Sequence, residues 1–404
     1  MKYAQAIIAC AFFLFTELNA QVIRFNKAIE TALNPIWGWS ILINEDSTYT
    51  VISGNSDSLS NGGVFINIID EYGNTMLSNG FMDLSKIFYP GISNSGKRLS
   101  SGMIINVGSV TDYTLPDTPH KLAVLYKFGK EGDTIFKKYY DITHETIGQG
   151  SCVTKNDNVL LLGSTYDSIT NNVDVAVIKT DSSGNEIWAK KFGGSFYDAT
   201  STAIEYASEK FMVFCHRSYA QQYGAPWILK LDSSGNLIQQ KLFYNIPNNP
   251  KFAGSFWATN GINQNIVIHG YLDTTTVFPP QWNAFYPAFV GTMDTSMNLQ
   301  IIYAFDEQDP SKPYVIKQIK DSSYVAIGFK YYSRAGFISK ISPSGQLLWE
   351  REYVYGNQYN FNYFADFEQT YDGGFIITGS TIGDLSQDMW LVKLDSLGLL
   401  NDSL

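Results

Sequence analysis

The sequence predicts an all-β protein, a single seven-bladed β-propeller of four-stranded antiparallel blades, with six or eight blades as the alternatives if a weak copy is miscounted. Two observations support this prediction. A unit of about fifty residues recurs along the whole chain, and this period is typical of propeller blades rather than of helical solenoids. The composition agrees, because 45% of the 404 residues are hydrophobic and 15% are aromatic, and aromatic residues favour half-buried strands.

The clearest copy of the unit begins at Lys179 and reads KTDSSGNEIWAKKF, and the next begins at Lys230 and reads KLDSSGNLIQQKLF. The Asp181 carboxylate can accept hydrogen bonds from nearby backbone N–H groups, and Gly184 supplies a positive φ, so this stretch is predicted to close a hairpin. Six of the seven copies have glycine at this position and the fifth has Met297, so the turn of the fifth copy could have a different conformation. The equivalent position holds, in chain order, Gly73, Gly132, Gly184, Gly235, Met297, Gly345 and Gly398.

A second polar turn lies upstream in each copy, as in KNDNVLLLGS from Lys155 and YDGGFIITGS from Tyr371. Each such turn precedes an apolar strand that often ends in glycine. If the four strands are named A to D from the axis outward, this is the A–B turn and the Asp-Gly turn is the C–D turn. Both turns then lie on one face of the ring, and the B–C and D–A loops lie on the other.

The two ends of the chain predict how the ring closes. The last copy has only residues 399–404 for its D strand, whereas residues 22–29, VIRFNKAI, precede the first A strand and resemble a D strand. We therefore expect the N-terminal strand to pair with the last blade, which removes the free edges that invite aggregation. The alternative is that residues 399–404 complete the last blade alone.

Residues 1–20 are predicted to be a secretory signal peptide, with residues 21–404 as the propeller. Lys2 supplies the positive charge, the apolar run from Ile7 to Phe15 is too short to span a bilayer, and Ala20 is the small residue at the cleavage position. A buried N-terminal strand or helix is the alternative. No later segment is apolar enough to cross a membrane, so we expect a secreted or cell-surface protein, with the periplasm as the alternative location.

Charge and cysteine content limit the partners and the covalent structure. The net charge is −10 and there is no basic block, which argues against nucleic acid because phosphate binding needs clustered Lys and Arg. Cys152 and Cys215 fall in adjacent repeats at different points of the unit, so two separate buried thiols are expected rather than a disulfide. We expect a monomer.

Motifs for catalysis or metal binding are missing from the sequence. No GxSxG, HExxH or P-loop pattern is present, and no two of the four histidines have metal-ligand spacing on one strand or helix. The Asp-Ser-Ser-Gly-Asn turns offer too few carboxylates for calcium. His216 and His269 follow B strands and could approach each other, but scattered surface histidines are the expectation. We predict no catalytic residue, no metal and no cofactor.

The pattern DGGFIITGS…DMWLVKLDSLG in the last copy resembles the repeats of secreted β-propeller proteins common in Bacteroidetes-type bacteria. The resemblance covers essentially the whole mature chain, although blades one, two and five match poorly. It implies a propeller architecture more than an activity. In that family a sorting domain for type IX secretion often follows the propeller, and this chain ends without one.

Loop length differs between the two faces of the predicted ring. The A–B and C–D turns are short and polar, whereas several B–C and D–A connections are long and aromatic, as in LDTTTVFPPQWNAFYP from Leu272. Long loops on a rigid scaffold often carry function, and aromatic rings beside amides suit sugar or peptide recognition. The alternative is that these rings plug the axial channel. The candidate ligand-binding residues are Trp282, Phe285, Tyr286, Tyr219, Tyr223, Tyr359 and Tyr363.

Two hypotheses about function follow. The first is a non-enzymatic binding or structural module that recognises protein or glycan through the aromatic B–C and D–A loops. The second is a glycan-active hydrolase or lyase with carboxylates at the mouth of the axis, for which Asp366, Asp198 and Glu205 near the A strands are candidates. A hydrolase of this kind needs two carboxylates about 5–10 Å apart across a cleft.

Overall fold

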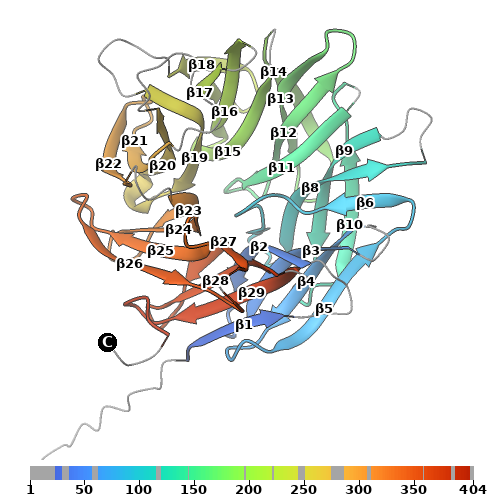
Figure 1. The fold of residues 1–404 in the computed structure, drawn as a ribbon. Coiled ribbons are helices and arrows are strands. Elements are labelled where there is room, and N and C mark those ends of the chain that lie inside the picture. The colour runs from blue at the N-terminus through green and yellow to red at the C-terminus, as the bar shows by residue number, and fades with distance from the viewer. Residues whose placement is uncertain are drawn as a thin grey trace, which may run out of the picture.

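A computed structural model describes residues 23–29, 36–56, 62–114, 120–143, 145–194, 197–220, 223–243, 251–273, 286–306, 311–357, 359–383 and 387–400. These residues form seven antiparallel sheets arranged as blades in a ring (Figure 1). The described part contains one short 3-10 turn, Ile262–Gln264, and otherwise only strands and their connections. The predicted seven-bladed β-propeller is confirmed.

The strands follow the predicted order from the axis outward in each blade. Blade one has β2 (Ile36–Ile43), β3 (Tyr49–Ser56), β4 (Gly62–Ile69) and β5 (Thr75–Met82). Blade two has a split inner strand, β6 (Lys86–Tyr89) and β7 (Lys97–Arg98), then β8 (Ile104–Asp112), β9 (His120–Phe128) and β10 (Thr134–Tyr140). Blade three has β11 (Glu145–Val153), β12 (Val159–Asp167), β13 (Asn172–Thr180) and β14 (Glu186–Phe192).

The remaining four blades repeat this arrangement. Blade four has β15 (Asp198–Ala207), β16 (Lys210–Ala220), β17 (Tyr223–Leu231) and β18 (Leu237–Leu242). Blade five has β19 (Lys251–Asn260), β20 (Ile266–Asp273), β21 (Ala288–Met293) and β22 (Leu299–Ala304). Blade six has β23 (Ser311–Gln318), β24 (Tyr324–Lys330), β25 (Ala335–Ile341) and β26 (Leu347–Tyr353). Blade seven has β27 (Phe361–Gln369), β28 (Phe375–Ile382) and β29 (Gln387–Leu394).

The N-terminal strand completes blade seven, as predicted. Strand β1 (Phe25–Ile29) pairs antiparallel with β29 along its whole length, from Phe25 opposite Lys393 to Ile29 opposite Met389. The sheet order β1-β29-β28-β27 therefore joins the two ends of the chain in one blade (Figure 1). This pairing gives the last sheet its outer strand and closes the ring. Residues 401–404, which the alternative closure requires, lie outside the described residues.

The C–D turns share one geometry, which follows from their sequence. In blade three the Asp181 carboxylate accepts hydrogen bonds from the backbone N–H groups of Ser183 and Asn185, at 2.8 Å each, and Gly184 has a φ of 74°. Met297 takes the same left-handed conformation, with a φ of 63°, and Asp294 caps its turn in the same way. The different turn left open for the fifth copy is therefore not found.

A bulge in the inner strands explains why the B strands contain glycine. The register of β11 against β12 shifts between Gly148 and Gly150, and that of β27 against β28 shifts between Phe364 and Asp366. The extra residue brings the inner backbone close to the B strand. A Cβ on Gly163 would lie 1.9 Å from the carbonyl oxygen of Ile147, so no larger residue fits there.

The core consists of apolar layers between neighbouring blades. One layer joins blades six and seven and contains Phe364, Phe367 and Trp390, all fully buried. Cys152 and Cys215 lie in the layer between blades three and four, and both are buried and free, as expected. No helix among the described residues is long and apolar enough to cross a membrane.

Candidate functional site

A cavity of about 320 Å³ lies at the centre of the ring. It is lined by the inner strands β7, β11, β15, β19 and β23, by residues 92–95 and by His269 of β20. Arg98, Val153 and Asn260 line it and are the last residues of β7, β11 and β19. The cavity therefore reaches the face of the A–B turns, opposite the face of long loops on which the sequence placed the site.

The break in the inner strand of blade two shapes this cavity. The segment between β6 and β7, residues 90–96, contacts the inner strands on both sides: Ile92 donates its backbone N–H to the Gln149 carbonyl oxygen at 2.9 Å, and Gly96 donates to Ser40 Oγ at 3.1 Å. Asn94 is held with a φ of 59°. This insertion replaces part of a regular strand, and nothing in the repeat pattern predicts it.

Lys97 and Arg98 are the ionised side chains of the cavity lining, and no carboxylate of the described residues belongs to it. Lys97 Nζ donates to the Asn94 carbonyl oxygen and to Asn94 Oδ1, both at 2.7 Å. Lys97 is half-buried and lines the cavity. Burial, assisted by the nearby charge of Lys317, lowers the pKa of Lys97 to about 8.

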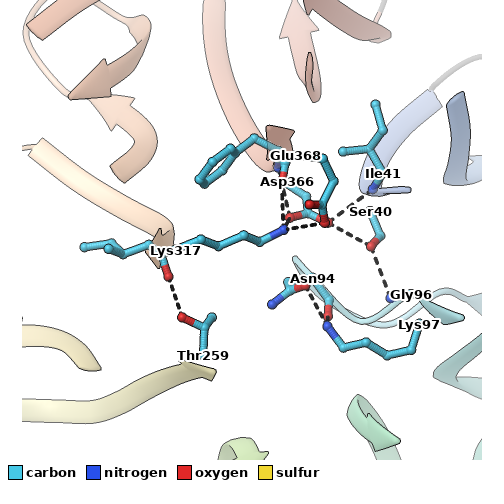
Figure 2. A network of polar contacts seen from close by, with 11 residues as sticks. Ser40, Ile41, Asn94, Gly96, Lys97, Thr259, Lys317, Asp366 and Glu368 are labelled. Carbon is cyan, nitrogen blue, oxygen red and sulfur yellow. Dashed lines mark hydrogen bonds and ion pairs between the residues drawn. The ribbon is translucent and has the colours of Figure 1, made fainter. Parts of the chain in front are cut away.

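A buried polar network lies beside the cavity and ties blades six, seven, one and two together (Figure 2). Lys317 Nζ binds Asp366 Oδ1 at 2.9 Å and Glu368 Oε1 at 3.0 Å. Asp366 Oδ2 accepts from Ser40 Oγ at 2.9 Å and from the backbone N–H of Ile41 at 3.1 Å. Burial acts against the charge of Lys317, but the two carboxylates outweigh it and raise the pKa of Lys317.

His269 is a buried side chain of the cavity lining without a hydrogen-bond partner. Its ring is 3% exposed and stacks on Trp257, with centroids 5.5 Å apart and an angle of 15° between the planes. Neither ring nitrogen has a hydrogen-bond partner of good geometry among the described residues, although the nearby backbone of Tyr314 acts to raise the pKa of the ring. Burial lowers the pKa of His269 to about 3, so the ring is neutral.

The three described histidines are therefore not scattered on the surface as expected. His216 and His269 lie within strands β16 and β20 rather than after them, and both are at least partly buried. His120 is also largely buried and lies 3.5 Å from Asp141, while His144 is outside the described residues. Within the described ranges no three His, Cys, Asp or Glu side chains are placed to hold a metal ion.

The predicted ligand-binding residues do not form one group. Trp282 and Phe285 lie outside the described residues. Tyr219 and Tyr223 lie in β16 and β17 rather than in a loop, because these two strands keep pairing up to Ala220 opposite Tyr223. The sequence pattern also predicts a long B–C loop in blade four, from His216 to Pro226. This prediction is wrong, because most of that segment belongs to β16 and β17, which are separated by residues 221–222.

The other three predicted residues have different environments. Tyr286 is partly buried just before β21. Tyr363 lies on β27 with its ring 6.1 Å from that of Tyr314, and burial raises its pKa to about 12. Tyr359 is 65% exposed in the D–A loop that leads into blade seven. Among the three residues of this group whose exposure the structure describes, Tyr359 alone has a largely exposed ring.

Tyr359 belongs to a larger group that the sequence analysis missed, called here the aromatic surface of blades six and seven. Arg334 lies over the Phe361 ring at 4.6 Å and donates to the Tyr359 carbonyl oxygen at 3.1 Å. Phe329 links Phe361 to Tyr331 and Tyr332, with ring centroids about 6 Å apart at each step. The sequence does contain a sign of this surface, because the adjacent tyrosines in YYSRAG directly follow the apolar B strand of blade six.

The three carboxylates proposed for catalysis lie in separate places. Asp366 is 1% exposed, and its carboxylate forms an ion pair with Lys317 and accepts hydrogen bonds from Ser40 and from backbone N–H groups. Glu205 accepts from the backbone N–H groups of Lys155 and Glu209, at 2.8 Å each, and joins the A–B turns of blades three and four. Both carboxylates hold the scaffold together, and neither lines the cavity.

Asp198 is the exception among these carboxylates. It is 1% exposed, and no hydrogen bond of good geometry reaches its oxygens within the described ranges, although the nearby backbone N–H groups of Gly194 and Ser218 act to lower its pKa. Burial raises the pKa of Asp198 to about 6, Arg217 opposes this effect and Asp174 adds to it. Asp198 can therefore hold a proton near neutral pH.

The fold defines the chain as a seven-bladed β-propeller, and comparisons with known proteins agree at this level. No family model and no curated protein matches the chain. The β-propeller domain of the Trilobed protease from Pyrococcus furiosus, described as having an open velcro topology, aligns over 93% of this chain and 98% of its own, with a TM-score of 0.51 and 10% identity. The ring described above, by contrast, is closed by β1.

Two enzymes share the architecture to a similar degree. A catalytically inactive virginiamycin B lyase from Staphylococcus aureus, solved with quinupristin, has a TM-score of 0.50 and 11% identity over 91% of this chain and 99% of its own. The GH93 α-L-arabinofuranosidase of Fusarium graminearum, solved with arabinobiose, has a TM-score of 0.50 and 10% identity over 92% of this chain and 98% of its own. At such identities the likeness shows the fold alone.

Proposed function

We propose that this chain is an exported, non-enzymatic binding propeller that recognises glycan through the aromatic surface of blades six and seven. The observation that supports it is the exposure of two tyrosines on the loop face beside Arg334: Tyr332 is 68% exposed and Tyr359 is 65% exposed. Exposed tyrosine rings offer a flat apolar face for a sugar ring and a hydroxyl for hydrogen bonding.

Glycan is favoured over protein by the groups around these rings. Asn357 and Asn360 lie in the same D–A loop, and Asn360 Nδ2 donates to the Tyr355 carbonyl oxygen at 3.3 Å, which orders the loop beside Tyr359. Tyrosine hydroxyls, asparagine amides and the Arg334 guanidinium give this surface the hydrogen-bonding groups that sugar hydroxyls need. The arabinofuranosidase of the same fold was solved with arabinobiose, which is compatible with sugar binding by this architecture.

Binding to a glycan array tests the proposal. The wild-type protein is compared with the double variant Tyr332→Ala/Tyr359→Ala and with the matched control Tyr72→Ala/Tyr371→Ala, which removes two exposed tyrosines of the turn face. The double variant should lose about tenfold or more in affinity, because each stacking ring contributes on the order of 1 kcal/mol, and the control should bind normally.

Three outcomes would contradict this function. Wild-type protein could bind no glycan, the double variant could bind as well as the wild type, or a peptide array could give the stronger, tyrosine-dependent signal. The variants Trp282→Ala and Tyr286→Ala test the blade-five loop separately. Export is tested by locating the full-length protein in cell fractions, with cleavage expected after Ala20.

The alternative is a glycan-active hydrolase or lyase, and Asp198 is the observation that favours it. A carboxyl group with a pKa of about 6 has the property required of a general acid. Asp174 is close enough to affect it electrostatically, which brings two carboxylates together between blades three and four. Release of reducing ends from a polysaccharide panel by wild type, and its loss in Asp198→Asn, would favour this enzyme over the binding protein.

A further inference from the structure

We propose that the axial cavity binds a sugar acid, a molecule of monosaccharide size with one carboxylate and several hydroxyl groups. This site is separate from the aromatic surface of blades six and seven, and the two proposals stand or fall independently. Its volume of about 320 Å³ is at the lower end of the range of about 300–1,000 Å³ found for small-molecule sites. It therefore suits one small ligand rather than a polymer.

The charge of the lining selects an anion. The protein carries a net charge of −10, yet among the described residues the ionised side chains of this cavity are Lys97 and Arg98. Asp366 and Glu368 act on Lys97 from outside the lining, and both are bound to Lys317. The cavity is thus a local cationic site in an acidic protein, and a carboxylate is the complementary group.

Lys97 has bonding capacity left for that carboxylate. An ammonium group has three N–H donors, and two of them bind the carbonyl oxygen and Oδ1 of Asn94. The residues that the structure describes offer no acceptor for the third. Arg98 is partly engaged, with Nη1 bonded to the Gly102 carbonyl oxygen and Nη2 bonded to Asn44 Oδ1, so Lys97 is the primary contact for the ligand.

His269 supplies the second, independent indication of a ligand. A neutral imidazole has one N–H donor and one acceptor nitrogen, and both are buried without partners in this lining. Leaving such groups unpaired costs on the order of 1–3 kcal/mol. Hydroxyl groups both donate and accept, so a polyhydroxy ligand can satisfy the ring. Trp257, stacked on His269, provides an apolar wall of the kind that sugar rings use.

Carboxylate binding should also change the reactivity of Lys97. With its pKa lowered to about 8, mainly by burial, part of the amine is neutral and nucleophilic at pH 8. A carboxylate bound to Nζ favours the charged form and blocks access. The amine should therefore react more slowly with an electrophile when the site is occupied.

Trace acetylation of the wild-type, full-length protein measures this directly. Acetic anhydride labels lysines at pH 8, and mass spectrometry follows Lys97 and the exposed Lys155 as an internal control. D-glucuronate at about 10 mM should slow labelling of Lys97 about tenfold if Kd is near 1 mM, since protection scales as 1 + [L]/Kd. Glucose and acetate, tested at the same concentration, should protect much less, and Lys155 should not change.

Equal labelling of Lys97 with and without glucuronate would overturn the proposal, as would equal protection by acetate. A second measurement is calorimetric titration of His269→Phe, which keeps the ring stacked on Trp257 but removes both nitrogens. This variant should bind glucuronate at least about tenfold more weakly, or about 1.4 kcal/mol, with an unchanged circular dichroism spectrum. Unchanged affinity in this variant would contradict the role assigned to hydroxyl groups.

Discussion

Trp390 Nε1 donates a hydrogen bond of 2.6 Å to Oδ1 of Asn26, a residue 364 positions earlier in the chain. Trp390 is fully buried and stacks on Phe364, with ring centroids 4.4 Å apart. The bond therefore joins β1 to the apolar layer between blades six and seven. It adds a specific side-chain contact to the backbone pairing that closes the ring.

The substitution Asn26→Ala is expected to lower the free energy of unfolding by about 1–3 kcal/mol, because it leaves the buried indole N–H without an acceptor. The neighbouring variant Lys27→Ala loses an exposed bond to Asn74 and a cation–π contact with the Phe25 ring, and should lower the free energy of unfolding by no more than about 1 kcal/mol. Urea unfolding followed by tryptophan fluorescence measures both. Equal stability of the two variants would show that the Trp390 bond does not contribute to closure.

The Lys317–Asp366 ion pair should behave as a buried pair whose charges depend on each other. Lys317→Met is expected to destabilise the protein by about 3–5 kcal/mol, because it leaves the Asp366 charge uncompensated. Adding Asp366→Asn to that variant should recover about 1 kcal/mol or more. The exposed Lys320→Met is the control. If Asp366→Asn makes Lys317→Met still less stable, the hydrogen bonds of Asp366 matter more than its charge.

Asp198 makes stability depend on pH in a defined direction. Its pKa is raised to about 6 in the folded protein, against about 3.9 in an unfolded chain. Because the folded protein holds this proton more tightly than the unfolded chain does, the contribution of protonated Asp198 to the free energy of unfolding is complete below about pH 4. It is lost as the pH rises through about 6. The substitution Asp198→Asn removes this titration. Its effect on the free energy of unfolding should therefore be more stabilising at pH 8 than at pH 4, by about 2 kcal/mol. Denaturation at the two pH values measures this difference, and a pH-independent effect would contradict the raised pKa.

Met297 is expected to be better than glycine at its turn, although the other C–D turns have glycine there. Its left-handed backbone costs about 1–2 kcal/mol, but its side chain is fully buried in the layer between blades four and five, and loss of a buried Met side chain costs about 2–5 kcal/mol. Met297→Gly should therefore lower the free energy of unfolding by about 2 kcal/mol. If Met297→Gly has a free energy of unfolding equal to or higher than that of the wild type, the strain of the left-handed backbone outweighs the burial of the Met297 side chain.

Much of the architecture follows from local chemistry that can be read along the chain. Asp181 and Gly184 specify a turn without reference to any other blade, and this turn recurs at the repeat spacing, so blade order and turn geometry were predictable. The N-terminal strand was also predictable, because residues 22–29 resemble the D strand that the last copy lacks.

Contacts between distant residues decided the rest. The sequence alone could not show that Lys317 from blade six meets Asp366 from blade seven, or that the segment before Lys97 turns toward the axis. Nor could it show that His269 is buried beside Trp257. These side chains meet because seven inner strands converge on one axis, and convergence depends on how the blades pack in three dimensions. Local sequence patterns specify each blade, whereas the site between the blades depends on the closed ring.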